Sequence, residues 1–181
     1  MFSTTLEEPE RLSKAPHGLL GEHLGLAPAS VSASQLHTYD AQRRDPRGPT
    51  LGVAWWSPIP SSVAMDKPSH FAPADQAGSM RLAFGQAQIV SDAVARLEDQ
   101  LQYTSVAAHL CGPSFTMAQL RHVYEVIWNV SLDAANFHRK VIGMPGFVES
   151  TGRQAMGGPG RPALLYRKGT ADQLDGVIGR P

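Results

Sequence analysis

The sequence predicts an α+β protein made of two units that are joined by a long helix. Residues 1–78 are rich in Pro, Ser and Ala and contain only short strand-like segments. Residues 84–101 contain no proline and show an apolar repeat of helical period. From residue 113 onward the pattern changes again, to two short helices and then a hairpin with a glycine-rich tip. These three differences in composition and hydrophobic periodicity predict the division into units.

Charge follows the same division. Residues 1–114 hold eight Lys and Arg against eleven Asp and Glu, a net of −3, and residues 115–168 hold seven against three, a net of +4. The basic rear favours a nucleic-acid partner, although a lopsided solvated surface would give the same count. The single Cys111 excludes a disulfide framework and a cysteine-rich zinc site. With no signal peptide and no long apolar run, we expect a cytoplasmic protein without a membrane span.

In the front unit, residues 35–39 and 50–59 are predicted to be strands, joined by a turn over residues 43–49. They are expected to pair as a hairpin of a larger sheet. Residues 60–78 contain several prolines and are predicted to form a loop. The helix that follows buries an apolar stripe, typical of a core helix, of a helix joining two domains, or of one pairing with a symmetry mate. The stripe comprises Val90, Val94, Leu97 and Leu101.

The rear unit begins with a helix whose N-cap is predicted at Thr116, with Gln119 completing a capping box. Its buried stripe is expected to comprise Leu120, Val123, Tyr124 and Ile127. The helical pattern breaks over residues 129–132, and Asp133 is placed to cap a second helix. Two consecutive short helices separated by a tight turn are therefore predicted.

The second helix is predicted to have an apolar anchor beneath a polar, basic face. Phe137 and Val141 should face the core, and Asn136, Arg139 and Lys140 should face outward. Gly143 and Pro145 mark its end. A short strand over residues 147–149, a glycine-rich loop over 153–161 and a returning strand over 163–166 complete the unit. Leu164 and Tyr166 are expected on the core face of the returning strand.

This order of elements is typical of a winged helix-turn-helix. In that arrangement the second helix enters the major groove of DNA, and the hairpin wing lies on the backbone or in the minor groove. A winged helix that binds protein is the alternative, but the basic faces of helix and wing argue against it. The residues predicted to contact DNA are Asn136, His138, Arg139, Lys140, Arg153, Gln154 and Arg161.

Residues 115–167 resemble the C-terminal winged-helix domain of Nudix-related transcriptional regulators of the NrtR type. Three family patterns are present: FT-x-x-x-L-x-x-x-Y-E, L-D-x-x-N-F-x-R-K and G-R-P-A-x-x-Y. They correspond to Phe115, Thr116, Leu120, Tyr124 and Glu125; to Leu132, Asp133, Asn136, Phe137, Arg139 and Lys140; and to Gly160, Arg161, Pro162, Ala163 and Tyr166. The segment LAFGQAQIVSDAVARLEDQLQYT resembles the family's linker helix, and RRDPRGPTLGVAWWSPIP resembles a late hairpin of its Nudix domain.

The resemblance implies a partial Nudix-like α/β sandwich over residues 1–78 as a sensor, linker helices over 79–112 and the winged helix-turn-helix over 113–168. Residues 169–181 are predicted to be a disordered tail. The resemblance also implies a cytoplasmic bacterial repressor that binds a palindromic operator in double-stranded DNA as a homodimer. ADP-ribose or a related nucleotide metabolite would release it, and no cofactor would be required. Genes of NAD metabolism are the targets in one branch of the family, and genes of sugar use in others.

The front unit departs from the Nudix box G-x5-E-x7-R-E-U-x-E-E-x-G-U, where U is apolar. Aligned over residues 4–26, the box has Gly18 at the arginine position, and Leu19 and His23 at glutamate positions. Those glutamates would hold Mg²⁺, so we predict that the protein is not an enzyme and has no catalytic residue or metal site. Gly18, Pro16 and Gly21 would also weaken the helix of the box.

Four residues remain candidates for residual metal or ligand contacts, although ordinary surface roles are more common for such groups: Glu10, Glu22, Arg44 and Arg47. Two alternatives stay open for the chain. One is a Nudix phosphohydrolase that acts on a nucleoside diphosphate derivative such as ADP-ribose and needs Mg²⁺. The other is a DNA-binding relic that answers to no ligand. Family members carry further strands before the box, so the front unit is expected to be truncated or differently folded.

Overall fold

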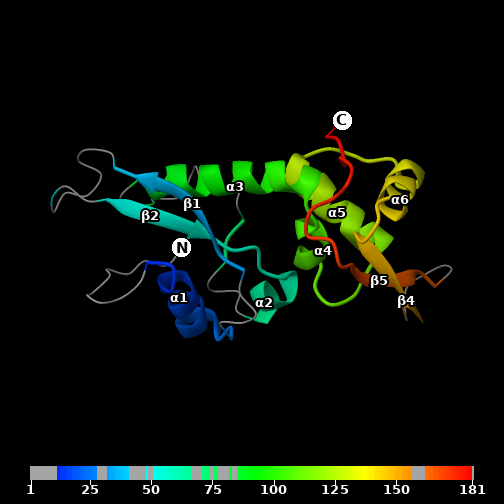
Figure 1. Cartoon of the computed structure of the whole chain (residues 1–181), viewed down its shortest axis with the longest axis horizontal. Coiled ribbons are helices and arrows are strands. Elements are labelled where there is room, and N and C mark those ends of the chain that lie inside the picture. Colours follow the sequence, from blue (N-terminus) through cyan, green and yellow to red (C-terminus); the bar gives the residue numbers. More distant parts are fainter. Residues whose placement is uncertain are drawn as a thin grey trace. The chain divides into compact units, whose positions relative to one another are not determined.

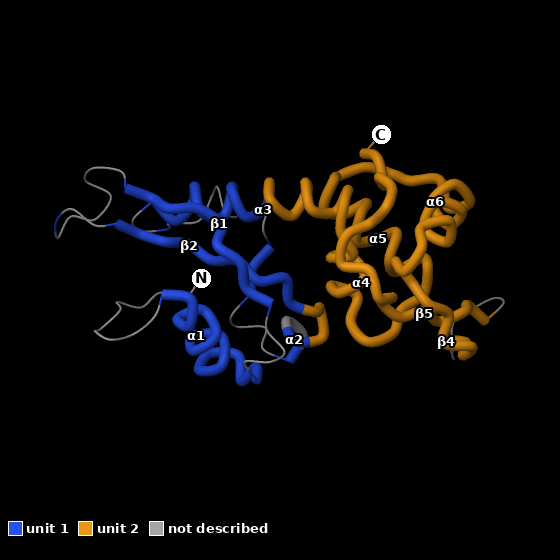
Figure 2. The backbone as a smooth tube through the Cα atoms, in the orientation of Figure 1, with its two compact units in different colours: residues 1–59, 63–94 blue, residues 60–62, 95–181 orange. Residues whose placement is uncertain are grey.

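A computed structural model of the chain describes residues 12–27, 32–40, 48, 51–66, 71–73, 76, 82, 85–155 and 162–180. The chain divides into two compact units (Figure 2): a front unit of residues 1–59 and 63–94, and a rear unit of residues 60–62 and 95–181. The rear unit thus begins well before the predicted boundary at residue 113, and the front unit continues past residue 78. Across the described residues, no helix is long and apolar enough to cross a membrane.

The front unit contains helix α1 (Ala15–Leu24) and the antiparallel strands β1 (Ser34–Tyr39) and β2 (Gly52–Trp56), seen in Figure 1. The predicted pairing of the two strands is confirmed. Pro16 and the glycines do not prevent α1 from forming, because Pro16 lies in the first turn, where no backbone N–H is needed. The predicted turn between the strands lies almost wholly outside the described residues.

One prediction for residues 60–78 is wrong. Ser61–Asp66 forms helix α2, whereas residues 60–78 were expected to be a loop. The six helical residues lie between Pro60 and Pro68 and contain no proline themselves, so the prolines bound the helix instead of excluding it. A proline count over the whole segment does not show that these six residues contain none.

The long helix α3 (Gln86–Tyr103) confirms the predicted amphipathic helix and is followed by α4 (Val106–Leu110). Leu101 is fully buried in the core of the rear unit, and Leu97 packs against that core. Residues 106–108 of α4 are also buried there. The last turns of α3 and all of α4 are therefore structural parts of the rear unit and not only linkers.

The rear unit is a three-stranded sheet packed against helices. Strand β3 (Phe115–Thr116) leads into α5 (Met117–Trp128), and α6 (Ala134–Ile142) precedes the hairpin of β4 (Val148–Gln154) and β5 (Leu164–Lys168). The strand order is β3-β5-β4, and all neighbours are antiparallel. The predicted helix, turn, helix and hairpin are all present, whereas the edge strand β3 was not predicted. Strand β4 is also longer than the predicted 147–149, because residues 150–154 extend it.

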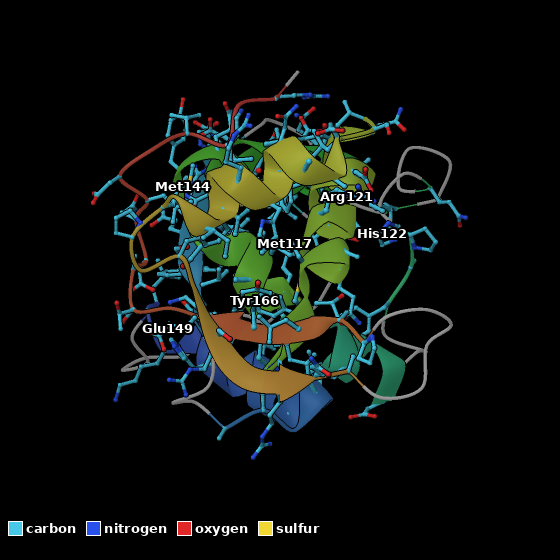
Figure 3. The ribbon with its side chains drawn as sticks, turned by 90° about the vertical axis from the view of Figure 1, so that its right-hand side faces the viewer. Met117, Arg121, His122, Met144, Glu149 and Tyr166 are labelled. Carbon is cyan, nitrogen blue, oxygen red and sulfur yellow. The ribbon has the colours of Figure 1, made fainter. Side chains whose placement is uncertain are left out.

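The core of the rear unit joins both helices to the sheet. Tyr124 of α5 makes edge-to-face contacts with Trp128 and with Phe137 of α6, at centroid distances of 5.0 and 5.3 Å. Tyr166 of β5 lies between the sheet and α5 (Figure 3). The predicted stripe of α5 is confirmed, with Leu120 and Tyr124 fully buried. The other fully buried large side chains are Leu101, Phe115, Trp128, Val141, Phe147 and Ile178.

Leu164 corrects the predicted core face of β5. Its side chain is 38% exposed, although Tyr166, two residues on, is buried. The register pairs Leu164 with Gln154, toward the wing tip, whereas Tyr166 pairs with both Phe115 and Ser150 in the middle of the sheet. The alternation of side chains along a strand predicts which face of the sheet a side chain lies on, but it does not predict whether another element covers that face there.

The C-terminal segment corrects another prediction, because residues 169–180 are ordered and packed. The amide of Leu174 donates to the carbonyl of Tyr103 at 2.8 Å, and the amide of Ile178 donates to that of Gln102 at 3.2 Å. The Ile178 side chain is buried in the core. The Arg180 guanidinium then pairs with a carboxylate oxygen of Glu98 and donates to the Trp128 carbonyl, each at 3.0 Å. The predicted disordered tail is therefore a strap across α3 and α5.

Candidate nucleic-acid interface

Helix α6 begins at a firmly capped N-terminus. The Asp133 side chain accepts a hydrogen bond from the Asn136 amide at 2.8 Å, as predicted for an N-cap. Phe137 and Val141 are buried and anchor the helix. The predicted polar residues Asn136, His138, Arg139 and Lys140 are all exposed.

The outward face of α6 is centred on Arg139. Because successive helical residues are rotated by about 100°, Arg139 lies about 180° from the midline between Phe137 and Val141. Arg139 also donates to the Asn136 side-chain oxygen at 2.7 Å, which joins the two side chains on one surface. A guanidinium and an amide held together in this way offer several hydrogen-bond donors to a partner that lies across the helix.

Every carboxylate between residues 115 and 168 has an internal role. Glu125 pairs with Arg121 at 3.5 Å, and Glu149 of β4 pairs with Arg167 of β5 at 2.8 Å. The third, Asp133, caps α6. Farther along the chain, Asp172 holds Lys168 at 2.7 Å, and that hydrogen bond lowers the pKa of the Asp172 carboxyl.

The other cations of residues 115–168 are those of α6 and of residues 153–161. Within the described residues, neither Lys140 nor Arg153 forms an ion pair, and Arg139 bonds to a neutral amide. The predicted wing residue Arg161 lies outside the described residues. The described cations of residues 115–168 that form no ion pair are therefore Arg139 and Lys140 of α6 and Arg153 of β4.

A bulge in β4 shapes the wing. The pairing register shifts between Ser150 and Gln154, and Gly152 there has a φ of 70°, a left-handed conformation that favours glycine. The Thr151 hydroxyl donates to the Leu165 carbonyl at 2.8 Å and accepts from the Arg153 amide at 3.2 Å. The bulge therefore sets where the exposed Arg153 and Gln154 lie as the strand approaches its tip.

Two residues of this surface were missed by the sequence reasoning. Ala135 and Ile142 are both exposed, and they lie about 40° and about 60° from Arg139 around the helix axis. Alanine and isoleucine have no charged or hydrogen-bonding group, so a search for polar side chains does not identify them. The helical period, applied to every residue of α6, would have placed both on the outward face.

The candidate ligand residues of the front unit are less fully placed. Glu22 is exposed on α1, which also carries Leu19 and His23 at the glutamate positions of the box. Glu10, Arg44 and Arg47 lie outside the described residues. In the part of the chain that the structure describes, no cluster of His, Cys, Asp or Glu is arranged to hold a metal ion.

A polar cluster that the sequence reasoning did not predict ties β1 to α3 in the front unit. The Tyr39 hydroxyl donates to one carboxylate oxygen of Asp92, and the Gln88 amide donates to the other, each at 2.7 Å. These hydrogen bonds, that of Tyr39 foremost, hold the pKa of the Asp92 carboxyl below its usual value. The cluster fixes the first half of α3 to the front sheet.

Comparison with known proteins finds a family profile that matches part of the rear unit. Residues 107–167 match the family profile of the NrtR DNA-binding winged helix domain. The chain is 30% identical over 167 residues to the ADPR responsive transcriptional repressor NtrR of Acinetobacter baylyi, and the match covers 90% of this chain. It covers 65% of that repressor, so the chain spans just under two thirds of the relative's length.

Solved structures show the same fold. The chain matches Shewanella oneidensis NrtR complexed with a 27mer DNA at a TM-score of 0.81 and 23% identity, over 97% of this chain and 83% of that one. A MutT/nudix family protein from Enterococcus faecalis matches at a TM-score of 0.67 and 18% identity, over 91% of this chain and 72% of that one. The predicted α+β fold, with Nudix-like and winged-helix parts, is confirmed.

Proposed function

We propose that this chain, whose residues 107–167 match the family profile of the NrtR DNA-binding winged helix domain, is a DNA-binding transcriptional repressor. The observation that carries the proposal is the charge pattern of the rear unit. The acids of residues 115–168 are engaged in caps and ion pairs, while the basic side chains of α6 stay exposed. A capped helix with such a face suits insertion into the major groove, and the hairpin suits contact with the backbone.

In this proposal each side chain has a role set by its position. Arg139, at the centre of the outward face, reads a base edge together with Asn136, and His138 and Ala135 lie beside them. Lys140, Arg153, Gln154 and Arg161 contact phosphates or the minor groove. The protein acts as a homodimer, so the contacts are repeated at two half-sites of a palindromic operator.

We also propose that the front unit senses ADP-ribose or a related nucleotide metabolite and that its binding releases DNA. The support is the similarity to a repressor described as ADPR responsive, which extends over nine tenths of this chain and so includes the front unit. Glu10, Glu22, Arg44 and Arg47 are the candidate contacts.

Hydrolysis of the effector is not part of the proposal. Leu19 and His23 occupy positions of α1 where a working Nudix box needs the carboxylates that hold Mg²⁺. Incubation of the protein with ADP-ribose and Mg²⁺ is expected to give no AMP. Measurable turnover that is abolished by Glu22→Gln would instead support the phosphohydrolase alternative.

A binding titration tests the main proposal. Genomic DNA fragments retained by the full-length protein are sequenced, and a labelled duplex of the recovered site is titrated at several salt concentrations. If Lys140, Arg153 and Arg161 of both protomers each contact one phosphate, the slope of log K against log [salt] is about −5. The recovered duplex should bind more tightly than a scrambled duplex of equal length, and ADP-ribose should weaken that binding. Equal affinity for both duplexes at every salt concentration would overturn the proposal.

A further inference from the structure

The orientation of α6 is decided by a very short connection. Helix α5 ends at Trp128 and α6 begins at Ala134, so residues 129–133 alone join them. Among the described residues, Asn129 is the one non-glycine residue with a positive φ, at 52°. Asparagine adopts this conformation readily at the end of a helix, and hydrogen bonds to α5 hold the turn that follows.

One residue of α5 supplies most of those hydrogen bonds. The backbone carbonyl of Glu125 accepts from the amide of Asn129, the C-cap of α5, and from that of Val130 at 3.1 Å. A side-chain oxygen of Glu125 accepts from the amide of Leu132 at 3.0 Å. Glu125 therefore contacts the backbone at both ends of the turn.

A neighbouring side chain completes the contact with Leu132. Arg121 lies on α5 (Figure 3). It is one helical turn before Glu125, donates to the Leu132 carbonyl at 3.4 Å and pairs with Glu125 at 3.5 Å. Both polar groups of the Leu132 backbone are thus held by α5. The next residue is Asp133, which caps α6, so the position of Leu132 sets where α6 begins.

A small change in the angle at which α6 begins gives a large displacement of the side chains proposed to contact DNA. Helix α6 has nine residues and is about 14 Å long, so a tilt of about 10° at its start displaces its far end by roughly 2 Å. A base contact tolerates only about 0.5 Å of misplacement. Glu125 itself lies on α5 and carries a negative charge, so it is not suited to contact phosphates.

We propose that Glu125 is a positioning residue for DNA recognition: its side chain holds the Leu132 amide and so fixes α6 at the angle that base readout requires. The inference rests on the proposed function. The reach of the side chain matters in this role, and its charge does not. Sequence-specific binding depends on Glu125, whereas binding to any duplex through phosphate contacts does not.

Two conservative variants separate reach from charge. Glu125→Gln keeps the length and an acceptor oxygen but loses the charge, and Glu125→Asp keeps the charge but is one methylene too short to reach Leu132. We expect the Gln variant to bind the recovered duplex within about threefold of wild type, and the Asp variant to bind it about tenfold or more weakly, as if one base contact were lost. Val126→Ala, at a side chain that is 61% exposed on the same helix, is the matched control.

Three further readouts distinguish positioning from a general loss of structure. The affinity of the Asp variant for a scrambled duplex and its salt slope should match those of wild type, because no phosphate contact is removed. Its melting temperature should stay above the assay temperature. The Leu132 amide should exchange with solvent about fivefold faster in the Asp variant, and at the wild-type rate in the Gln variant.

The reverse order of the two variants, with Gln weak and Asp normal, would overturn the proposal in favour of the ion pair with Arg121. Equal losses on both duplexes would assign Glu125 a purely structural role. If wild type itself showed no preference for any duplex, the proposed function and the recognition role would both fail. The exchange rate of the Leu132 amide would still report whether Glu125 holds the turn.

Discussion

Replacement of Ile178 by alanine tests whether the C-terminal strap is part of the folded rear unit. The side chain of Ile178 is 2% exposed and belongs to the cluster that includes Leu101, Trp128 and Tyr124. Its amide also donates to the Gln102 carbonyl, so the residue is held by both backbone and side chain. Truncation to alanine leaves the hydrogen bond in place and removes only buried apolar atoms.

The expected loss follows from this burial. Truncation of a fully buried isoleucine to alanine costs about 2–5 kcal/mol, and the lower end applies where the surroundings can relax. The strap is a terminal segment on the surface of the unit, so we expect about 2–3 kcal/mol. For a domain of about 60–100 residues each kcal/mol shifts the melting temperature by roughly 4–8 °C, which gives a fall of roughly 10–20 °C.

Differential scanning calorimetry of the full-length protein measures this fall in the transition of the rear unit. Val177→Ala is the matched control, because Val177 is the neighbouring residue in the strap and is 47% exposed. That control should change the free energy of unfolding by less than about 0.5 kcal/mol. If Ile178→Ala melted at the same temperature as wild type and the control, residues 169–180 would not be packed, and the sequence-based prediction of a disordered tail would stand.

Three more predictions concern the DNA surface and the titratable groups. Arg139→Ala should weaken binding to the recovered duplex by about 1–3 kcal/mol, with little effect on binding to a scrambled duplex. Lys140→Ala should weaken binding to both duplexes alike and lower the slope of log K against log [salt]. Equal behaviour of the two variants in these titrations would contradict the assigned roles. By NMR the Asp92 carboxyl should titrate below the usual range for aspartate, and Tyr39→Phe should raise its pKa. Because the folded-state pKa is lowered, the stabilisation is present at neutral pH and is lost as the pH falls through that pKa. Burial raises the pKa of the Cys111 thiol to about 12, so iodoacetamide at pH 8 should modify it more than about tenfold more slowly than in the urea-unfolded protein, as mass spectrometry would measure.

Elements whose signals are local could be predicted from the sequence. The capping box of Thr116 and Gln119 and the cap at Asp133 use residues within one helical turn, and both occur as expected. The anchor of Phe137 and Val141 also follows from a short-range period. These features place the recognition helix, so the part of the site that the sequence predicts best is the part built from contacts close in sequence.

Elements that depend on distant partners could not be predicted. Strand β3 has two residues and exists only because it pairs with β5, about 50 positions later. The strap has a polar, glycine-containing sequence, and its order comes from carbonyls of α3 and from the core beneath Ile178. The hydrogen bond between Glu125 and Leu132 spans seven residues across a turn whose shape it helps to create. No local pattern in the sequence carries these contacts.

The charge of residues 115–168 can be predicted in part from the sequence and depends in part on contacts between distant residues. The net of +4 over residues 115–168 can be counted from the sequence, but the count does not say which cations remain available to a partner. Arg121 is neutralised by a carboxylate four positions along its own helix, and Arg167 by the carboxylate opposite it across a hairpin, so the second pairing depends on the register of β4 and β5. A shift of that register by one residue would move Arg167 to the other face of the sheet and leave Glu149 unpaired. The availability of the cations on α6 and the wing is therefore a consequence of the fold, because Glu125 and Glu149 are each paired with another arginine.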